Sequence, residues 1–382
     1  MTFLRAACRW GFLLFAKVGA LLLLPRLTSS NYSDRIHRIL VYADMGIGNM
    51  ILFTPTLQAI RNQFPKAKIT LLIGNSGCDQ VIEYTSLVDE VLRVKYSLFE
   101  VVALAYVVRK KGFDLLVSSF LSGSKYLTLL TIFSGIPIRA GHCKGEDWFS
   151  PLDFLYNIQV KMNPGTHEVE RHLCLAEYLK CRKTDYPIKL KVSHEDHEFA
   201  DKFFAEHFSS ETKVMGISAG TSVSQNWKQW DIKKMAEVCD RSIEEFGFSI
   251  LLFGSKDLLP EQKLFLKHMK HDFVSCVGKT TIRQAAALIG KCSLMLASDT
   301  GLMHLGDAVG TCTLGIFGPT DHHRTRPWGE GSSVIRKVIS CSPCYTMPSL
   351  NSLVAKQCSH HDCLNSISPS DVISEIKRYV KK

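Results

Sequence analysis

The chain has 382 residues, of which 46% are hydrophobic and 21% charged, and its formal net charge is +10. A chain of this length exceeds what one hydrophobic core usually supports, so we predict two globular domains and exclude a disordered or fibrous protein. The positive charge favours an anionic partner, but it does not choose among nucleic acid, phosphorylated metabolites and anionic lipid.

An apolar segment lies near the N-terminus, at residues 10–24, and Lys17 interrupts it. It is shorter than the roughly 20 apolar residues that span a bilayer. On a helical wheel Arg5, Arg9 and Lys17 share one arc, and large apolar side chains occupy the opposite arc. This arrangement is typical of a helix that lies in the membrane surface, so we assign residues 1–30 to membrane association. A cleaved signal peptide and a tilted membrane span stay open as alternatives.

Basic residues continue after this segment, at Arg26, Arg35 and Arg38. Positive charge beside a membrane element favours the anionic, cytoplasmic leaflet. Several of the 13 cysteines fall within apolar strand or helix patterns, which is typical of a reducing compartment. We therefore expect the protein at the cytoplasmic face of the inner (cytoplasmic) membrane, peripheral or anchored by its N-terminal helix.

Short β-branched runs alternate with amphipathic stretches from residue 36 onward, and this pattern predicts parallel β-α-β units. We expect a first Rossmann-like domain over residues 35–186. A helix is predicted from Pro55 to Phe64, stopped by Pro65, and another over 168–180. The stretch after Gly141 has no regular pattern. The predicted strands of this domain lie near residues 39–43, 69–73, 90–94 and 115–118.

A second series repeats this architecture over residues 187–368. Its best-defined helix spans 232–246, with Asp231 as its N-cap and Gly247 as its C-cap. A C-terminal helix is expected from Pro369 to Val380, within the last segment, 369–382. In two-domain α/β proteins a helix at this place often packs back on the first domain. The predicted strands lie at residues 213–218, 250–254, 273–277, 294–297 and 313–317.

Loops that directly follow the strands are the first candidates for function, because parallel sheets bind ligands at the carboxyl ends of their strands. The first such loop spans Asp44 to Asn49, and its Gly46 and Gly48 would let backbone amides approach an anion or a sugar. The alternative is a glycine turn that close packing requires. No Gly-Lys-Ser or Gly-Lys-Thr follows, which excludes a Walker A loop.

The second loop runs from Ser218 to Trp230 and is rich in hydroxyl groups. Its Thr221, Ser222 and Lys228 suit a pyrophosphate, because hydroxyls and an ammonium group bind phosphate oxygens. The alternative is an ordinary polar loop with a solvated lysine.

The third loop is the most informative one. Asp299 ends a buried strand and could accept hydrogen bonds from sugar hydroxyls, while the amides of Thr300 and Gly301 at a helix N-terminus could bind phosphate oxygens. His304 lies about one helical turn further, on the face of Thr300. As alternatives, Asp299 caps the helix and His304 is a core histidine.

The fourth loop places Gly318 and Thr320 where the backbone could meet the same ligand. His322 and His323 are adjacent and point differently, so a shared metal site there is not expected.

Four cysteines further along the chain have a spacing that is compatible with a zinc site. The alternative is a cysteine-rich surface loop in a reducing compartment. We predict no metal site. The four cysteines are Cys341, Cys344, Cys358 and Cys363.

Taken in this order, the loops resemble glycosyltransferase family 9, whose best-known members are ADP-heptose:lipopolysaccharide heptosyltransferases. The resemblance covers residues 36–382. It is carried by Thr54-Pro55 at the first helix, by Lys228-Gln229-Trp230, by Asp299-Thr300-Gly301 with His304, and by Gly318-Pro319-Thr320.

This resemblance implies a GT-B type α/β fold, in which two Rossmann-like domains with parallel sheets face a central cleft. It implies metal-independent, inverting transfer of a heptose or related sugar from a nucleotide-sugar, such as ADP-heptose, to the lipopolysaccharide core or another glycolipid. The expected partners are the donor, the acceptor and the membrane surface, without nucleic acid and without a cofactor. Lys228 would bind donor phosphate, Asp299 the sugar hydroxyls, and Thr300, Gly301 and His304 the diphosphate; the first domain would bind the acceptor.

One departure from the family is Asn49, which stands where the family has its presumed general-base aspartate. A carboxamide cannot take a proton from the attacking hydroxyl. Asp44 could substitute; alternatively, the protein is a degenerate, non-catalytic nucleotide-sugar or glycan binding protein. A dinucleotide-dependent oxidoreductase is excluded, because the third glycine and the later acidic residue of that fingerprint are absent.

Overall fold

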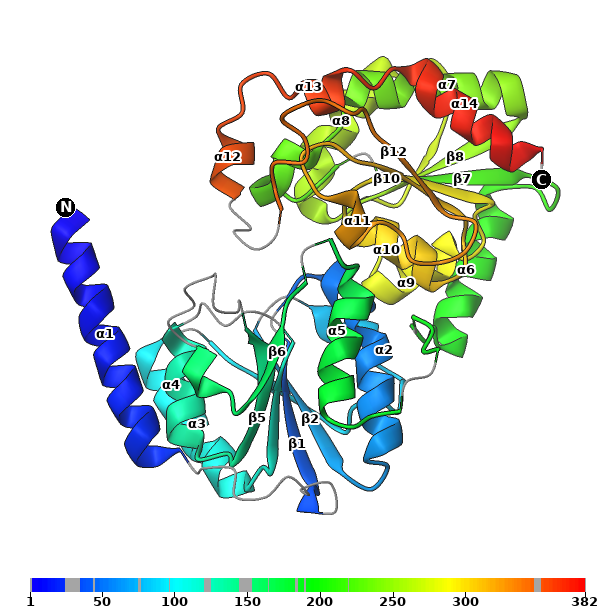
Figure 1. Cartoon of the computed structure of the whole chain (residues 1–382). Helices are drawn as coiled ribbons and strands as arrows, with labels where there is room; N and C mark the ends of the chain where they lie inside the picture. The colour runs from blue at the N-terminus through cyan, green and yellow to red at the C-terminus, as the bar shows by residue number, and fades with distance from the viewer. Residues whose placement is uncertain are drawn as a thin grey trace. The chain divides into compact units, whose positions relative to one another are not determined.

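The fold was obtained as a computed structural model and divides into two compact units (Figure 1). The first unit comprises Met1–Asn163 with Val169–Pro187, and the second comprises Pro164–Glu168 with Ile188–Lys382. The segment Pro164–Glu168 therefore belongs to the second unit, although residues of the first unit flank it on both sides. The structure describes residues 2–24, 35–43, 45–74, 77–95, 97–119, 125–143, 153–163, 165–182, 185–188, 190–218, 220–346 and 352–381.

The first unit is built on a six-stranded parallel sheet with the order β3-β2-β1-β4-β5-β6. All four strands predicted for this domain are present. Two further strands were not predicted. Polar residues interrupt the apolar run of β5, and β6 alternates buried and exposed positions over only four residues. The strands are β1 (Arg38–Tyr42), β2 (Lys68–Ile73), β3 (Glu90–Arg93), β4 (Leu115–Ser118), β5 (Ile138–Cys143) and β6 (Ile158–Lys161).

Helices cover both faces of this sheet (Figure 1). On one face α3 and α4 share an apolar core with the sheet, and α1 packs against α4, where Ala16 and Ile132 are fully buried. On the other face, Phe53 of α2 contacts the ring of His172 in α5. The helices are α1 (Thr2–Leu23), α2 (Ile47–Gln63), α3 (Leu98–Lys111), α4 (Lys125–Ser134) and α5 (Glu168–Tyr178), with short 3-10 turns η2 (Cys78–Val81) and η3 (Asp153–Leu155). Of the helices in the described residues, none has both the length and the apolar character needed to cross a bilayer.

Helix α2 begins eight residues before Pro55, so the prediction that the helix starts at this proline was wrong. A proline inside a helix leaves the carbonyl four residues earlier without its usual donor. Here the hydroxyl of Thr54 donates to that carbonyl, on Ile51, at 2.8 Å. The helix is therefore continuous through Pro55, and Gly46 becomes its N-cap.

The second unit has a six-stranded parallel sheet with the order β12-β11-β10-β7-β8-β9. Its five predicted strands are present, and β12 is additional. Strand β7 is central and the strand order reverses on its two sides, so the switch point lies between β7 and β10. The strands are β7 (Lys213–Ser218), β8 (Phe248–Phe253), β9 (Val274–Ser275), β10 (Leu294–Ser298), β11 (Thr313–Ile316) and β12 (Ser333–Ile335).

Two groups of helices flank this sheet, with α7, α8 and α14 on one face and α6, α9 and α10 on the other (Figure 1). Helix α7 has the predicted bounds, and Asp231 and Gly247 are its caps as predicted. The helices are α6 (His194–His207), α7 (Ile232–Phe246), α8 (Leu259–His268), α9 (Ile282–Ile289), α10 (Gly301–Ala308), α11 (His322–Thr325), α12 (Ser352–Lys356), α13 (Asp362–Asn365) and α14 (Pro369–Val380), with η4 (Val223–Lys228) and η5 (Lys256–Leu258).

The C-terminal helix α14 packs within the second unit. Its buried residues Val372, Ile373 and Ile376 join the core formed by α7 and the sheet, and a capping box at Ser368 starts the helix. Its apolar stripe is thus used in the core of the second unit.

Candidate functional site

A buried ion pair lies at the switch point of the second sheet. Nζ of Lys228 is 2.9 Å from Oδ2 of Asp299, and the two side chains are only 12% and 7% exposed. Asp299 directly follows β10, and Lys228 ends η4 in the connection after β7. The adjacent β7 and β10 run in parallel, with Ala297 paired to Ser218, which brings the ends of both strands to one edge. The sheet topology therefore unites two loops that are about 70 residues apart.

The carboxylate of Asp299 is charged in this setting. Burial by itself disfavours the charged form, but the nearby ammonium of Lys228, assisted by His304 and Thr320, outweighs burial and holds the pKa of Asp299 below its usual value. Asp299 therefore stays an acceptor of hydrogen bonds at neutral pH. A buried ion pair adds little net stability, so stabilisation of the fold gives only a weak reason for this pair.

Helix α10 begins immediately after the ion pair, with Thr300 as its N-cap. The Thr300 side chain makes no capping hydrogen bond, and the first turn contains no acidic residue. Within the described part of the chain, its buried hydroxyl has no hydrogen-bond partner. The amides of the first turn and this hydroxyl are thus available to an anion beside Lys228.

His304 lies within α10 and is 4% exposed. Its Nδ1 is buried and finds no partner among the described residues. Burial lowers the pKa of His304, although Asp299 and Asp307 act in the opposite direction, so the ring is neutral at physiological pH. A neutral imidazole can donate to or accept from a ligand without adding charge.

The loop after β11 contributes Thr320, which is buried close to Asp299 and pairs with Tyr345 in an isolated bridge. Gly318 lies in close contact with α13. A side chain at this position would overlap Leu364 and approach Cys363, so α13 packs directly on the backbone there. Close packing therefore favours glycine at position 318, and the contact of its backbone with the ligand stays a prediction.

The hydroxyl-rich loop after β7 separates into two kinds of residue. Thr221 is buried and its hydroxyl donates to the carbonyl of Gln225 at 2.9 Å, so it shapes the loop. Ser222 is exposed, and its hydroxyl lies 3.2 Å from that of Ser224. Of the two predicted donor-binding hydroxyls, the one on Ser222 is turned to solvent, while that of Thr221 is used internally.

A second basic residue of the site, Arg324, was not predicted from the sequence. Arg324 of α11 is 5% exposed, and its guanidinium contacts the buried carboxylate of Glu168. Burial lowers the pKa of Arg324, and the neighbouring Tyr345 and Asp299 oppose that shift. Arg324 follows directly on the fourth loop, so extending that loop by one residue would have found it. Glu168 gives no such signal, because it lies far away in the sequence.

Two aromatic rings lie next to the cationic groups of Lys228 and Arg324. The rings of Trp227 and Tyr345 meet edge to face at 5.2 Å, and Nζ of Lys228 lies 5.3 Å and 5.8 Å from their respective centres. The guanidinium of Arg324 lies 5.9 Å from the centre of Tyr345. Two cations and two aromatic rings therefore surround the region next to Asp299.

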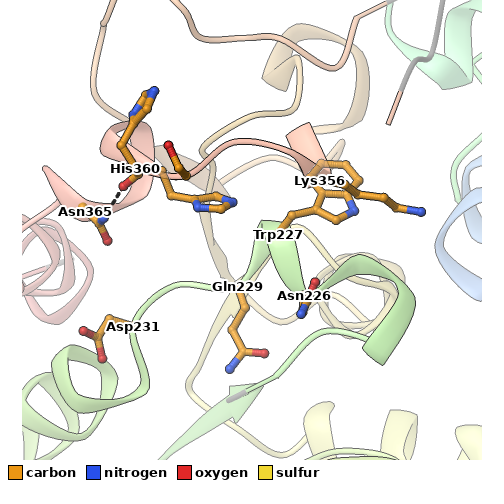
Figure 2. Close-up of a pocket in the computed structure, with 9 residues that line it drawn as sticks. Asn226, Trp227, Gln229, Asp231, Lys356, His360 and Asn365 are labelled. Atoms are coloured by element: carbon orange, nitrogen blue, oxygen red, sulfur yellow. Dashed lines mark hydrogen bonds between the residues drawn. The ribbon is translucent and has the colours of Figure 1, made fainter. Parts of the chain in front are cut away.

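A pocket of about 370 Å³ adjoins Trp227 (Figure 2). The loop after β7 forms one side of it and the segment from α12 to α13 forms the other. This pocket was not anticipated from the sequence. It is lined by Asn226, Trp227, Gln229, Asp231, Lys356, Ser359, His360, His361 and Asn365.

The four C-terminal cysteines line a second, smaller hollow of about 220 Å³. Burial raises the pKa of Cys363 to about 11, and burial raises that of Cys344 as well. Across the residues that the structure describes, no three His, Cys, Asp or Glu side chains are grouped as a metal ion would require.

In the first unit, Gly48 and Asn49 lie in the first turn of α2 and not in a loop before the helix, as the sequence suggested. Asn49 is half-buried, and the first turn carries no acidic residue. Asp44 lies outside the described residues.

Comparison with known proteins assigns the chain to a family. The sequence model of glycosyltransferase family 9 (heptosyltransferase) matches residues 101–355, more than half of the chain. The chain therefore belongs to glycosyltransferase family 9.

Individual relatives agree with this assignment. The chain is 30% identical to lipooligosaccharide heptosyltransferase 2 of Campylobacter jejuni (strain 81116) over 173 residues, 44% of this chain and 51% of that protein, so the match spans about half the relative's length. It is 24% identical to lipooligosaccharide heptosyltransferase 2 of Haemophilus ducreyi over 361 residues, 89% of this chain and 99% of that protein. The solved structure of Escherichia coli ADP-heptose LPS heptosyltransferase II has the same fold, with a TM-score of 0.71, 22% identity, and coverage of 90% of this chain and 98% of that one.

Proposed function

We propose that this chain transfers a heptose or a related sugar from a nucleotide-sugar, such as ADP-heptose, to the lipopolysaccharide core or another glycolipid, with inversion and without a metal ion. The observation that carries this proposal is the buried pair of Lys228 and Asp299 beside the free N-terminus of α10. The names of the relatives favour catalysis over a non-catalytic binding protein.

The donor would bind at the switch point of the second sheet. Asp299 would accept hydrogen bonds from the sugar hydroxyls, while Lys228 and the amides of Thr300 and Gly301 would hold the diphosphate, with the neutral ring of His304 one turn further. Arg324 adds a second positive charge close by. These fixed charges would stabilise the diphosphate that leaves, which is the task that a metal ion performs in other transferases.

In the reaction, the acceptor hydroxyl oxygen would bond to the anomeric carbon of the donor sugar. The bond from that carbon to the diphosphate oxygen would break, and its electron pair would leave with the nucleoside diphosphate. A general base must take the hydroxyl proton, and Asn49 cannot do so. We propose Asp44 for this role, since it is the carboxylate that stands five residues earlier in the sequence.

We also propose that the protein works at the cytoplasmic face of the inner membrane, where a glycolipid acceptor is accessible. Helices α1 and α3 both pack against α4, and both expose large apolar side chains. Positive charge lies beside these side chains, at Lys17 of α1 and in the basic last turn of α3. This combination fits an anionic bilayer surface. The exposed apolar residues of the two helices are Leu14, Phe15, Val18, Leu21, Leu22, Leu23, Leu98, Phe99, Val102, Tyr106 and Val107.

The proposal is tested with purified full-length protein, ADP-heptose and a heptose-deficient lipopolysaccharide acceptor, by measuring ADP release and mass change of the acceptor. We expect transfer by the natural protein and a fall of about 10²-fold or more for Asp299→Ala, because the sugar loses a charged acceptor. Thermal unfolding of the variant checks that the fold is kept. An Asp299→Ala protein that transfers sugar at the natural rate would refute the site.

A further inference from the structure

The pocket beside Trp227 is not used by the donor site described above. It lies between two segments far apart in sequence, with Asn226, Trp227 and Gln229 on one side (Figure 2). Lys356, His360 and Asn365 come from the C-terminal segment on the other side. Its volume of about 370 Å³ leaves room for a ligand of several polar groups.

The lining groups both donate and accept hydrogen bonds. The pocket holds the three carboxamides of Asn226, Gln229 and Asn365. The amide nitrogen of Asn365 already donates to the carbonyl of His360 at 2.6 Å, and each carboxamide still offers an acceptor oxygen and at least one donor hydrogen. Asp231 adds acceptors and Ser359 adds a hydroxyl. Sugar hydroxyls likewise donate and accept, so this mixture matches a polyol.

A phosphate group would need a different lining, with uncompensated positive charge. Here Lys356 shares the pocket with Asp231, and Nδ1 of His360 lies 3.1 Å from the carboxylate of Asp362. The charges of the pocket are therefore largely balanced, which favours a neutral saccharide over an anion.

Two lining groups lack the hydrogen bonds that burial normally demands. Trp227 is 5% exposed, and its indole N–H has no acceptor among the residues described. The buried Nε2 of His361 is also unpaired in the same part of the structure. His361 also has a left-handed backbone with φ of 47°, a conformation that few residues other than glycine adopt.

The pocket is next to the proposed reaction centre, because Trp227 precedes Lys228 and contacts its ammonium group. We infer that this pocket is a saccharide subsite, which binds a sugar unit of the acceptor's oligosaccharide beside the unit that receives the transferred sugar. The inference rests on the proposed function for its acceptor, and it deepens that function by placing part of acceptor recognition in the second unit.

The test uses full-length protein and a deacylated lipopolysaccharide core oligosaccharide as the probe. Isothermal titration should detect probe binding to the natural protein. Asn226→Ala and His361→Asn should each weaken it by about three- to tenfold, the loss of one hydrogen bond. Asparagine tolerates the left-handed backbone at position 361. ADP affinity should stay unchanged in both variants, and Gln262→Ala on α8 serves as an amide control outside the pocket.

The outcomes separate the two proposals. Unchanged probe affinity in both variants, or an equal loss of ADP affinity, would overturn the subsite. Probe binding that the variants weaken, in a protein that transfers no sugar, would keep the subsite and reject the proposed reaction. In an active protein, the KM for the acceptor should rise in the variants while the KM for the donor stays constant; a constant acceptor KM contradicts the subsite.

Discussion

At the scale of single residues, the Lys228–Asp299 pair shows why a buried charge is retained. Removing two charges from water costs about as much as their attraction returns, so the pair adds little to stability by itself. A diphosphate beside Lys228 and sugar hydroxyls on Asp299 would use the same charges productively. The unpaired hydroxyl of Thr300 and the unpaired Nδ1 of His304 in the described structure fit a site shaped for such a ligand.

Lys228→Ala tests the phosphate contact. We expect the dissociation constant for ADP to rise about 10- to 150-fold, which corresponds to a charge-assisted hydrogen bond of about 1.5 to 3 kcal/mol. Isothermal titration measures it, with the exposed Lys263→Ala on α8 as the matched control. An ADP affinity equal to that of the control would remove Lys228 from the donor site.

The identity of the general base is tested by Asp44→Asn and Asn49→Asp. If Asp44 takes the proton, Asp44→Asn should lower kcat by about 10²- to 10⁴-fold with little change in the donor KM. Asn49→Asp should keep or raise kcat, because it restores a carboxylate at the first turn of α2. Normal turnover by Asp44→Asn would exclude Asp44 as the base.

At the scale of elements, helix α1 was predicted as an apolar and basic helix, and it is one over Thr2–Leu23. Its packing partner α4 and the exposed face of α3 could not be read from the sequence, because the apolar residues of α3 do not separate into buried and exposed ones without tertiary contacts. Val101, Ala105 and Val108 face the core, whereas Phe99 is 83% exposed.

The proposed membrane face is tested with Leu21→Asp and Phe99→Asp. Each should reduce co-sedimentation with vesicles of anionic phospholipid about tenfold or more, because an apolar side chain of this size contributes about 1.5 to 3 kcal/mol on burial. Leu266→Asp changes a leucine of the second unit that is 62% exposed, against 70% for Leu21, and should have no effect. Equal binding by all three variants would show that α1 and α3 do not contact lipid.

At the scale of the whole molecule, buried histidines make the stability depend on pH. Burial, assisted by the charge of Arg171, lowers the pKa of His142 to about 3, and burial lowers that of His167 to about 4. In the unfolded chain both rings take up protons below their ordinary pKa of about 6.5, while in the folded protein they stay neutral. Stability is therefore fully present above that value and is lost as the pH falls from about 6.5 towards 4.

We expect the free energy of unfolding to decrease by about 1.4 kcal/mol per pH unit for each such histidine in this window. Urea unfolding at pH 7 and pH 5.5 measures the change. His142→Gln should remove the contribution of one histidine from the pH dependence of the free energy of unfolding. His194→Gln replaces an 86% exposed side chain and should leave that pH dependence unaltered. The same slope in both variants would contradict this origin.

Local signals in the sequence determined much of this protein. Strand β7 and helices α7 and α14 have their predicted bounds, because continuous apolar runs and capping residues act on neighbouring positions. The order of the loops also predicted that Lys228 and Asp299 serve one site, and the parallel sheet brings them within 2.9 Å.

Only the tertiary structure decided the remaining features, since each depends on residues that are distant in the chain. The partner of Arg324 is the distant Glu168, and the close packing at Gly318 comes from Leu364. The pocket beside Trp227 exists because α12 and α13 return to the loop after β7. Periodicity and spacing describe an element's own face and ends. Which element packs on that face, and which side chain pairs with a buried charged group, depends on the three-dimensional arrangement of the chain.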